Sequence, residues 1–336
     1  MPELASAELR ATARNGTRPV RGAGIASVAM CVPDRVIGNA QIAQRIGVEE
    51  SWITRRTGVQ RRRIARPEER LSAFAAEAGQ IALERAAVEP GAVDLILVAT
   101  MAADDLTPNA APLVAEELGA TAAGAIDIGA ACTGFLSALG LATAQVESHR
   151  ADNVLVIGAD LLSRITDPGD RATAALLADG AGAALVRSTG AAGRIGPVVL
   201  GSDGAHSALI TASHSDRVIH MNGHDTFKHA VARMSRATVE ALALADCSLD
   251  EVDLFVYHQA NSRIIRAVGE ELGLPPEKTA DYLAGYGNTS AATLPMALTL
   301  AEEEGRLPDG AVVLLAAFGA GLAWGATVVE WGVPDA

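Results

Sequence analysis

Short apolar runs alternate along this chain with longer segments in which apolar residues recur at helical spacing. The runs 93–100, 153–159, 252–260 and 311–317 have the composition of strands that are buried on both faces. The helical segments are 71–87, 112–118, 135–147, 227–245 and 262–272. Strands that alternate with helices predict an α/β protein with parallel sheets and crossover helices.

The same order of elements occurs twice. Each half has a buried strand, a strand-turn-helix, a second buried strand and a glycine-rich turn. The strand-turn-helix carries Cys132 in the first half and Asn288 in the second. Asp94 lies 38 residues before Cys132, and Asp253 lies 35 residues before Asn288. We therefore expect a flexible leader at 1–21, one half at 22–190 and a similar half at 191–336, with the boundary within 188–196.

Charge and cysteine content narrow the function classes. The 336 residues carry a formal net charge of −13, so bulk attraction to nucleic acid or to an anionic membrane is not expected. The three cysteines are an odd number in a large protein, which favours a reducing compartment over a disulfide framework, and we expect a cytoplasmic protein. They form no CxxC pair, so a cysteine-based zinc site is not expected. The uncharged segment 311–329 has nearly the length of a membrane span. Its three glycines indicate instead two buried strands joined by a glycine turn.

Basic residues gather in one short segment of this acidic chain. Six arginines fall within twelve residues: Arg55, Arg56, Arg61, Arg62, Arg63 and Arg66. Such a run is usually a solvated face. The functional alternative is a docking patch for a phosphate-bearing ligand or an acidic partner, because guanidinium groups bind phosphate with two hydrogen bonds.

Cys132 is the first candidate for chemistry. It follows a short apolar strand and precedes a helix, and the N–H groups and dipole of a helix N-terminus favour the thiolate. A buried structural cysteine is the alternative. His258 and Asn288 also follow strands, and ligands of such sheets bind at the carboxyl ends of strands. A cysteine, a histidine and an asparagine that converge would form an acyl-transfer site, whereas their flanking sequences do not resemble those of cysteine proteases.

Seven stretches between about residues 22 and 331 resemble the β-ketoacyl-acyl carrier protein synthase III family. They are, in order, ESWITRRTGVQRRRIA, IDIGAACTGF, DRATAALLADGAGAAL, MNGHDTFKHAV, VYHQANSRII, GYGNTSAATLPMAL and AFGAGLAWG. HQAN and GNTSAAT after a cysteine-bearing turn are the most specific of these signals. The resemblance implies a thiolase-like α/β fold, with two pseudo-symmetric halves in layered α-β-α-β-α packing.

The resemblance also implies a reaction. Cys132 would accept an acyl group from acyl-CoA, and a malonyl-carrier thioester would then lose CO2 and condense with that group to start a fatty-acid or polyketide chain. His258 and Asn288 would stabilise the enolate by hydrogen bonds. The backbone N–H groups of Cys132 and Ala320 would form the oxyanion hole, and Phe318 would lie by the acyl group. The two thioesters are substrates, and neither a metal nor another cofactor is expected.

Contacts to CoA follow from the same motifs. The resemblance places Trp52, Arg56, Thr57, Arg171, His224, Phe227 and Asn261 along the CoA and pantetheine. Structural alternatives exist for three of these residues. Trp52 would pack a helix, Arg171 would pair with Asp167 or Asp170, and Asn261 would cap the helix that begins at Ser262.

The expected partners are a second copy of the chain and an acyl carrier protein. In relatives, the position of Thr107 faces the acyl tunnel of the partner subunit, so we expect a homodimer, and a small threonine leaves room for a longer or branched primer. Lys228 and Arg263 would contact the acidic carrier, although Glu270 and Glu271 weaken that expectation. Two alternatives to condensation remain: transfer of the acyl group to an alcohol or amine of a natural product, and a catalytically silent subunit.

Overall fold

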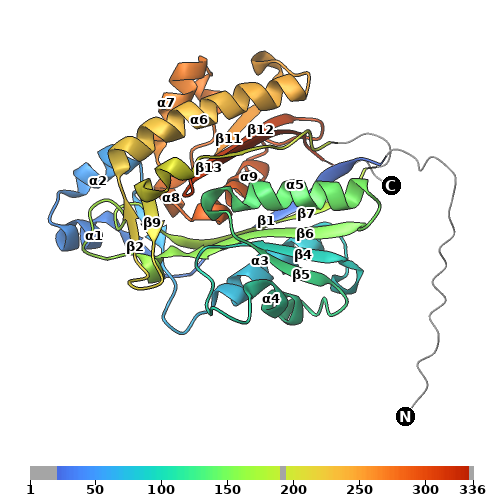
Figure 1. Cartoon of the computed structure of the whole chain (residues 1–336), viewed down its shortest axis with the longest axis horizontal. Coiled ribbons are helices and arrows are strands. Elements are labelled where there is room, and N and C mark those ends of the chain that lie inside the picture. Colours follow the sequence, from blue (N-terminus) through green and yellow to red (C-terminus); the bar gives the residue numbers. More distant parts are fainter. Residues whose placement is uncertain (1–20, 190–193, 333–336) are drawn as a thin grey trace, which may run out of the picture.

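The structure is a computed structural model that describes residues 21–189 and 194–332 (Figure 1). Residues 1–20 of the expected leader, and residues 190–193 at the expected boundary between the halves, lie outside the described residues. Within the described ranges, no helix combines the length and the apolar composition needed to cross a bilayer.

The first sheet has five strands in the order β1-β7-β6-β4-β5. These are β1 (Ala23–Cys31), β4 (Leu95–Ala99), β5 (Gly124–Ile128), β6 (Asn153–Leu161) and β7 (Asp179–Ser188). β5, β4 and β6 are parallel, whereas β7 and β1 are antiparallel to their neighbours. The expectation of purely parallel sheets is therefore wrong, because β6 and β7 are joined without a long crossover helix.

The second sheet repeats this topology with strands from the other half. Its order is β11-β12-β13-β8, with β8 (Val199–Ser202), β11 (Leu254–Tyr257), β12 (Val312–Gly319) and β13 (Ala323–Glu330). β11 and β12 are parallel, and β13 is antiparallel to both β12 and β8. The place that β5 fills in the first sheet is reduced to a bridge between Phe255 and Thr279. β12 and β13 confirm that 311–329 is two strands joined by a glycine turn.

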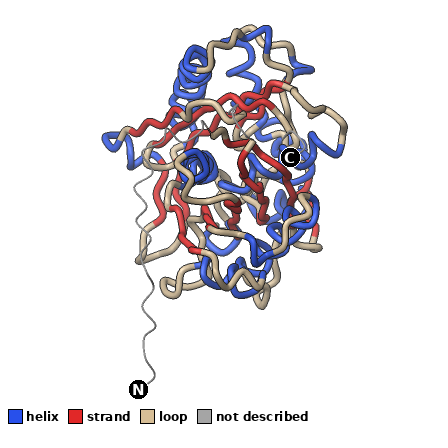
Figure 2. Tube along the Cα trace, turned by 90° about the vertical axis from the view of Figure 1, so that its right-hand side faces the viewer, coloured by secondary structure: helices blue, strands red, loops and turns tan. Residues whose placement is uncertain are grey.

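Helices and sheets alternate in five layers (Figure 1). α5 (Gly134–Glu147) and α9 (Thr293–Glu303) lie between the sheets and share one core with both of them. α3 (Leu71–Arg85) and α4 (Ala110–Leu118) cover the outer face of the first sheet. α6 (Gly223–Leu244) and α7 (Ser262–Leu272) cover the outer face of the second. Figure 2, turned by 90°, shows strands on both sides of the central helices, which confirms the α-β-α-β-α packing.

Smaller elements surround one end of the two sheets. α1 (Asn39–Ile46), α2 (Glu50–Thr57) and the hairpin of β2 (Val36–Gly38) and β3 (Arg61–Arg63) share a separate apolar cluster. β9 (Ile210–Ala212) and β10 (Ile219–Met221) form a second hairpin, and α8 (Leu283–Tyr286) leads directly to Asn288. All five predicted helices are present, each with its ends within four residues of the predicted ends.

Equivalent residues of the two halves differ in number by the same amount from the first buried strand of each half to its central helix. Asp94 accepts the N–H of Asn153, the first residue of β6, and Asp253 accepts that of Val312, the first residue of β12. These two aspartates are 159 residues apart, and so are the starts of α5 and α9. In this register Cys132 corresponds to Ala291. The pairing of Cys132 with Asn288 that the sequence suggested is therefore wrong by three residues.

Gly158 of β6 is where the first sheet meets the second half. A Cβ at Gly158 would lie 2.3 Å from the carbonyl oxygen of Ala291 and 2.6 Å from its carbonyl carbon. Backbone atoms cannot rotate away as a side chain can, so this contact requires glycine. The contact holds the turn before α9 against the first sheet.

We expect Gly158→Ala to lower the free energy of unfolding by about 1–3 kcal/mol, the usual effect of forcing atoms into a packed interior. Chemical denaturation with and without the substitution measures this difference. Gly285→Ala is the matched control, because a Cβ there would meet nothing within 4 Å. Equal stability of the two variants would contradict the close approach.

Candidate active site

Cys132 lies where a turn of the first half meets a turn of the second. It is the middle residue of the 3-10 turn Ala131–Thr133, which joins β5 to α5. Ala131 has φ of 44°, a left-handed conformation that is strained for a residue with a Cβ. Gly319, at the end of β12, packs against the cysteine: a Cβ at Gly319 would lie 2.9 Å from the Cys132 nitrogen. This close approach brings the turn that follows β12 next to Cys132.

The thiol of Cys132 is the favoured form near neutral pH. Burial raises its pKa to about 11, and the negative charge of Asp160 acts in the same direction. Hydrogen bonds from Ser290 and from the cysteine's own backbone lower the pKa but do not compensate for burial. The backbone hydrogen bond acts in the direction expected of a helix start, but the loss of water outweighs it, so the expected net preference for the thiolate is wrong.

A pocket of about 630 Å³ contains Cys132. Nearly all of the predicted site residues line it: Trp52, Arg56, Thr57, Cys132, Arg171, His224, Phe227, Lys228, His258, Asn261, Arg263, Asn288, Phe318 and Ala320. Thr107 does not line the pocket and lies in an exposed loop. A group drawn from both halves of the chain thus converges on one cavity, whose other walls are largely apolar.

His258 follows β11 directly and is 2% exposed. Its Nδ1 lies 2.6 Å from the hydroxyl oxygen of Thr293, which is also 2.9 Å from the carbonyl oxygen of Ser290. The hydroxyl has one proton, and the Ser290 carbonyl can only accept it, so an Nε2–H donor on His258 requires that this proton turn to Nδ1 instead. Burial lowers the pKa of His258 to about 3, so the imidazole is neutral at physiological pH.

Asn288 is held by both its side chain and its backbone. Its Oδ1 accepts the N–H of Ser290 at 2.8 Å, and its backbone N–H and C=O pair with Leu176 and Ala178. Because the amide oxygen is occupied, the NH2 group is the part of the amide that remains to donate. Asn288 and His258 thus contribute a neutral amide donor and a neutral imidazole to the same pocket.

α2 contributes an aromatic and a basic side chain to the pocket. The Arg56 guanidinium lies 5.8 Å from the ring centroid of Trp52, within the range of a cation–π contact. Trp52 also packs against the apolar cluster of α1 and α2. It therefore both packs a helix and lines the pocket, so the two predicted roles do not exclude each other. Thr57 donates its hydroxyl to the carbonyl of Ile53 and accepts the N–H of Val59, so its oxygen is used within the protein.

Arg171 and Asn261 resolve two of the sequence alternatives. Arg171 donates to the carbonyls of Ile46 and Gly47 at the end of α1, and within the described ranges it forms no ion pair with an aspartate. The expected alternative pair with Asp167 or Asp170 is therefore wrong. Asn261 caps α7 by accepting the N–H of Arg263, and its amide donates to the carbonyl of Arg56. It is both a cap and a wall of the pocket.

The arginine-rich segment is not a single patch. Arg62 is fully buried and donates to Asn39 Oδ1 and to the carbonyl of Ala175, and burial lowers its pKa to about 10. Arg63 donates to backbone carbonyls, and Arg66 pairs with Glu69. Of the six arginines only Arg56 lines the pocket. Four of the six, Arg55, Arg56, Arg61 and Arg66, are exposed, as a solvated face predicts. The alternative of one docking patch is wrong, because Arg62 is buried and the others do not share the pocket.

The basic and histidine residues beside the pocket have local partners. Lys228 lies 3.5 Å from Asp225, and Arg263 lies 5.5 Å from the ring centroid of Phe227. His220 contacts Asp216, and His229 packs on the ring of His206. In residues 21–189 and 194–332, no group of three or more His, Cys, Asp or Glu side chains is arranged to hold a metal ion.

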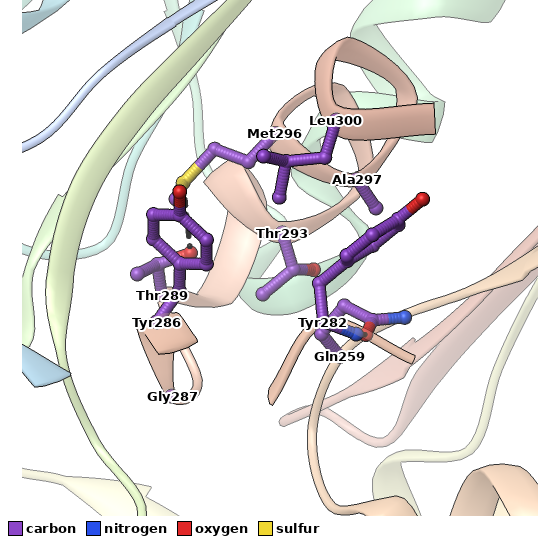
Figure 3. A pocket seen from close by; sticks show the side chains of 9 residues that line it. All are labelled: Gln259, Tyr282, Tyr286, Gly287, Thr289, Thr293, Met296, Ala297 and Leu300. Atoms are coloured by element: carbon purple, nitrogen blue, oxygen red, sulfur yellow. Dashed lines mark hydrogen bonds between the residues drawn. The ribbon is translucent and has the colours of Figure 1, made fainter. Parts of the chain in front are cut away.

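A small second cavity is lined by the residues that flank His258 and Asn288 in the chain, among them Gln259, Gly287 and Thr289. Figure 3 shows Thr293, Met296, Ala297 and Leu300 of α9 facing Tyr282 and Gln259 across it. Gln259, next to His258, donates to the carbonyls of Tyr257 and Ala280 and accepts the N–H of Tyr282. Its amide therefore fastens the end of β11 to the segment before α8, which keeps His258 in place.

Sequence reasoning missed three polar residues at the site. Thr293 and Ser290 lie within the motif GNTSAAT. Hydroxyl residues so close to Asn288 in the sequence could have indicated that they support it. Asp160 ends the apolar run of β6, and a carboxylate at the carboxyl end of a buried strand was also visible in the sequence. Their contacts with one another depend on the packing of the two halves.

Comparisons with known proteins give the family. Residues 126–220 match the sequence model of 3-oxoacyl-[acyl-carrier-protein (ACP)] synthase III, and residues 242–331 match that of its C-terminal part. The chain is 40% identical over 327 residues to a β-ketoacyl-[acyl-carrier-protein] synthase III of Symbiobacterium thermophilum, with 93% of this chain and 99% of the relative covered. It is also 40% identical over 312 residues to synthase III 2 of Streptomyces coelicolor, covering 92% and 94% of the two chains.

Solved structures agree with the sequence comparisons. The synthase III from Aquifex aeolicus has a TM-score of 0.89 and 38% identity, with 92% of this chain and 100% of that chain covered. The priming β-ketosynthase of the R1128 polyketide pathway has a TM-score of 0.90 and 35% identity, with 96% and 100% covered. The fold is that of the thiolase superfamily. The chain belongs to the β-ketoacyl-acyl carrier protein synthase III family.

We expect Thr293→Val to slow malonyl-thioester decarboxylation by roughly 30-fold, because His258 loses the partner that sets its tautomer, and a lost buried hydrogen bond costs about 2 kcal/mol. Radiolabelled CO2 release measures this step. Thr293→Ser is the control, since it keeps the hydroxyl and should retain most of the rate. Wild-type decarboxylation in the valine variant would show that His258 does not depend on Thr293.

Proposed function

We propose that this chain is a condensing acyltransferase that starts fatty-acid or polyketide chains. Cys132 takes an acyl group from acyl-CoA, and the acyl-enzyme condenses with a malonyl-carrier thioester as CO2 leaves. The observation that carries this proposal is the convergence of Cys132, His258 and Asn288 on one largely apolar pocket of about 630 Å³ in a member of this family. The thioesters are the substrates, and we propose no resident metal or cofactor.

In the first step, the Cys132 sulfur attacks the acyl carbonyl and displaces CoA. The carbonyl oxygen becomes an oxyanion, which we propose is bound by the backbone N–H groups of Cys132 and Ala320. Donors of this kind are worth about 3–4 kcal/mol each in the transition state. Gly319 supports the arrangement because a side chain there would occupy the space beside the Cys132 nitrogen. Ala320 is not among the described non-glycine residues with positive φ, so its backbone carries no left-handed strain in this turn.

In the second step, CO2 leaves the malonyl group and its thioester oxygen becomes an enolate. We propose that the Nε2–H of His258 and the amide NH2 of Asn288 donate to this oxygen. Both groups are neutral and already fixed by Thr293 and Ser290, so little reorganisation accompanies the development of charge. The enolate carbon then attacks the acyl carbonyl on Cys132, with Phe318 beside the acyl group.

The remaining walls of the pocket suit a CoA or carrier arm. Trp52, Arg56 and Arg171 are proposed to contact the nucleotide end of CoA, with Thr57, His224, Phe227 and Asn261 along the rest of it. Lys228 and Arg263 are proposed to meet the acidic carrier, although Glu270 and Glu271 on α7 oppose it. The related proteins are named as a β-ketoacyl-[acyl-carrier-protein] synthase III and a priming β-ketosynthase, which does not favour the alternative of acyl transfer to an alcohol or amine. We also propose that the protein acts in the cytoplasm.

We further propose a homodimer. β5 is an edge strand of the first sheet, and Ile126 on it is 51% exposed. Leu106, beside Thr107, is 78% exposed. An exposed edge strand and apolar side chains favour pairing with another chain. We propose that the loop of Thr107 then meets the partner's pocket, as the resemblance implies.

Intact-mass spectrometry tests the proposed function. Incubation with acyl-CoAs of varied length should add one acyl group to Cys132, and malonyl-carrier should then discharge it as a β-ketoacyl product with CO2 release. Cys132→Ala should show no adduct. An acyl-enzyme that malonyl-carrier cannot discharge would refute condensation, and no acylation by any thioester would leave the silent-subunit alternative.

For the dimer, light scattering of the wild type should give twice the 34.4 kDa of one chain. Ile126→Lys should shift the equilibrium to the monomer, because a charge would be buried at the new edge pairing. Leu244→Lys is the control, since Leu244 is similarly exposed but lies at the end of α6. A monomeric wild type at micromolar concentration would contradict the dimer.

A further inference from the structure

A separate cavity of about 210 Å³, which we call the side cavity, adjoins the pocket that contains Cys132. It is enclosed by the loop 101–106, by the 3-10 turn Leu162–Ile165 and by the hairpin of β9 and β10. Among the described residues, Met101 is the one that lines both cavities. The pocket and the side cavity therefore face each other across a single side chain.

The wall between the two cavities is apolar. Three segments each contribute one residue to the pocket and another to the side cavity: Met101 and Ala102, Leu162 and Ile165, and Ile210 and Ala212. All of these residues except Ala212 pack in one apolar cluster. Because different side chains face the two cavities elsewhere, the wall is thinnest at Met101.

Met101 lies at the catalytic part of the pocket. It follows the end of β4 by two residues, and its sulfur lies 3.6 Å from the hydroxyl oxygen of Ser290, whose N–H holds Asn288. The backbone N–H of Met101 donates to Asp160 at 2.9 Å, which fixes the main chain at this point. The side cavity thus adjoins the part of the pocket in which an acyl group on Cys132 would begin.

The lining of the side cavity differs from that of the pocket. Asp104 and Arg164 line the side cavity and form an ion pair, and Asp105, which also lines it, pairs with Arg70. An apolar chain is stabilised by the apolar walls of the pocket, whereas it gains less beside charged groups, which retain their water. The lining therefore changes from largely apolar to charged on the two sides of Met101.

We propose that Met101 is a specificity-determining residue that sets the upper length of the acyl group on Cys132. The inference rests on the proposed function, and it narrows the substrates to primers whose apolar chain ends inside the pocket. The unbranched thioether side chain fills the gap between the two cavities, while its main chain is held by Asp160. A longer chain can enter the side cavity only when this side chain is shortened.

Single-turnover acylation of Cys132 by saturated acyl-CoAs of increasing length tests the limit. In the wild type, dodecanoyl-CoA should react more slowly than butanoyl-CoA. Met101→Ala should raise the dodecanoyl-to-butanoyl rate ratio by at least about tenfold, because one methylene in an apolar pocket is worth about that factor. Met101→Val should raise the ratio less. Met101→Leu is the control, since it conserves the volume of the side chain and should keep the wild-type ratio.

The ratio separates a length limit from a structural role. Both rates come from the same variant, so a loss of folded protein cancels from their ratio. A structural role of Met101 would slow both acyl-CoAs equally in Met101→Ala and leave the ratio unchanged, which would overturn the proposal. A wild type that accepts dodecanoyl-CoA as fast as butanoyl-CoA would also overturn it.

Filling the side cavity tests where the longer chain goes. Ala212 is exposed and lines the side cavity but not the pocket. Ala212→Trp alone should leave the rate ratio within about twofold of the wild type, because Met101 already closes the path. Added to Met101→Ala, it should return the ratio most of the way to the wild-type value. A ratio that stays high in the double variant would contradict entry into the side cavity.

Alkyl methanethiosulfonates test the same limit without any thioester. The Cys132 sulfur loses its proton to solvent, displaces methanesulfinate and forms a mixed disulfide with the alkylthio group. The dodecyl-to-butyl ratio should again rise in Met101→Ala, and peptide mass mapping separates Cys132 from Cys31 and Cys247. If this ratio rises but no acyl-CoA acylates the wild type, the proposed function fails and the length limit stands. If acyl-CoAs acylate the wild type but neither ratio rises, the length limit fails and the proposed function stands.

Discussion

The backbone contact between the two halves is the constraint on which the site depends. A Cβ at Gly319 would lie 2.9 Å from the nitrogen of Cys132, and one at Gly158 would lie 2.3 Å from the carbonyl oxygen of Ala291. A strand of each half thus runs close to the turn that begins the other half's central helix. These contacts are made by main chain, which cannot adjust as side chains do. The positions of Cys132, Asn288 and Ser290 relative to one another are therefore set by the packing of the sheets rather than by local flexibility.

Removal of water governs the electrostatics of the pocket. It makes the thiol of Cys132 harder to ionise, keeps His258 neutral and raises the pKa of Asp160. A site of neutral donors is well matched to a reaction in which negative charge appears on a thioester oxygen and then disappears. The same loss of water leaves Cys132 as the thiol, which is less reactive than the thiolate, so the thiol must lose its proton when it attacks.

Most of the fold and the main site residues could be predicted from the sequence. The buried strands and the helices have clear periodicity, and Cys132, His258 and Asn288 lie in distinctive motifs. The antiparallel part of each sheet could not be predicted, because β7 and β13 have the same apolar composition as parallel strands. The burial of Arg62 and Asp160 also could not be predicted. A charged side chain can be buried only where distant backbone groups form hydrogen bonds with it, and the sequence does not show which groups those are. The raised pKa of Cys132 was missed for the same reason.

Asp160 and Gly319 are 159 residues apart, the same separation as Asp94 and Asp253, so they occupy equivalent places in the two halves, which bears on how such a chain arose. An ancestor with two identical halves would have had either two open turns or two filled ones. In the present chain, the cysteine and the open turn lie on opposite halves, and so do Ala291 and the carboxylate that fills the other turn. A single pocket therefore draws on both copies of the repeat, while the two copies have diverged at the residue that faces this turn.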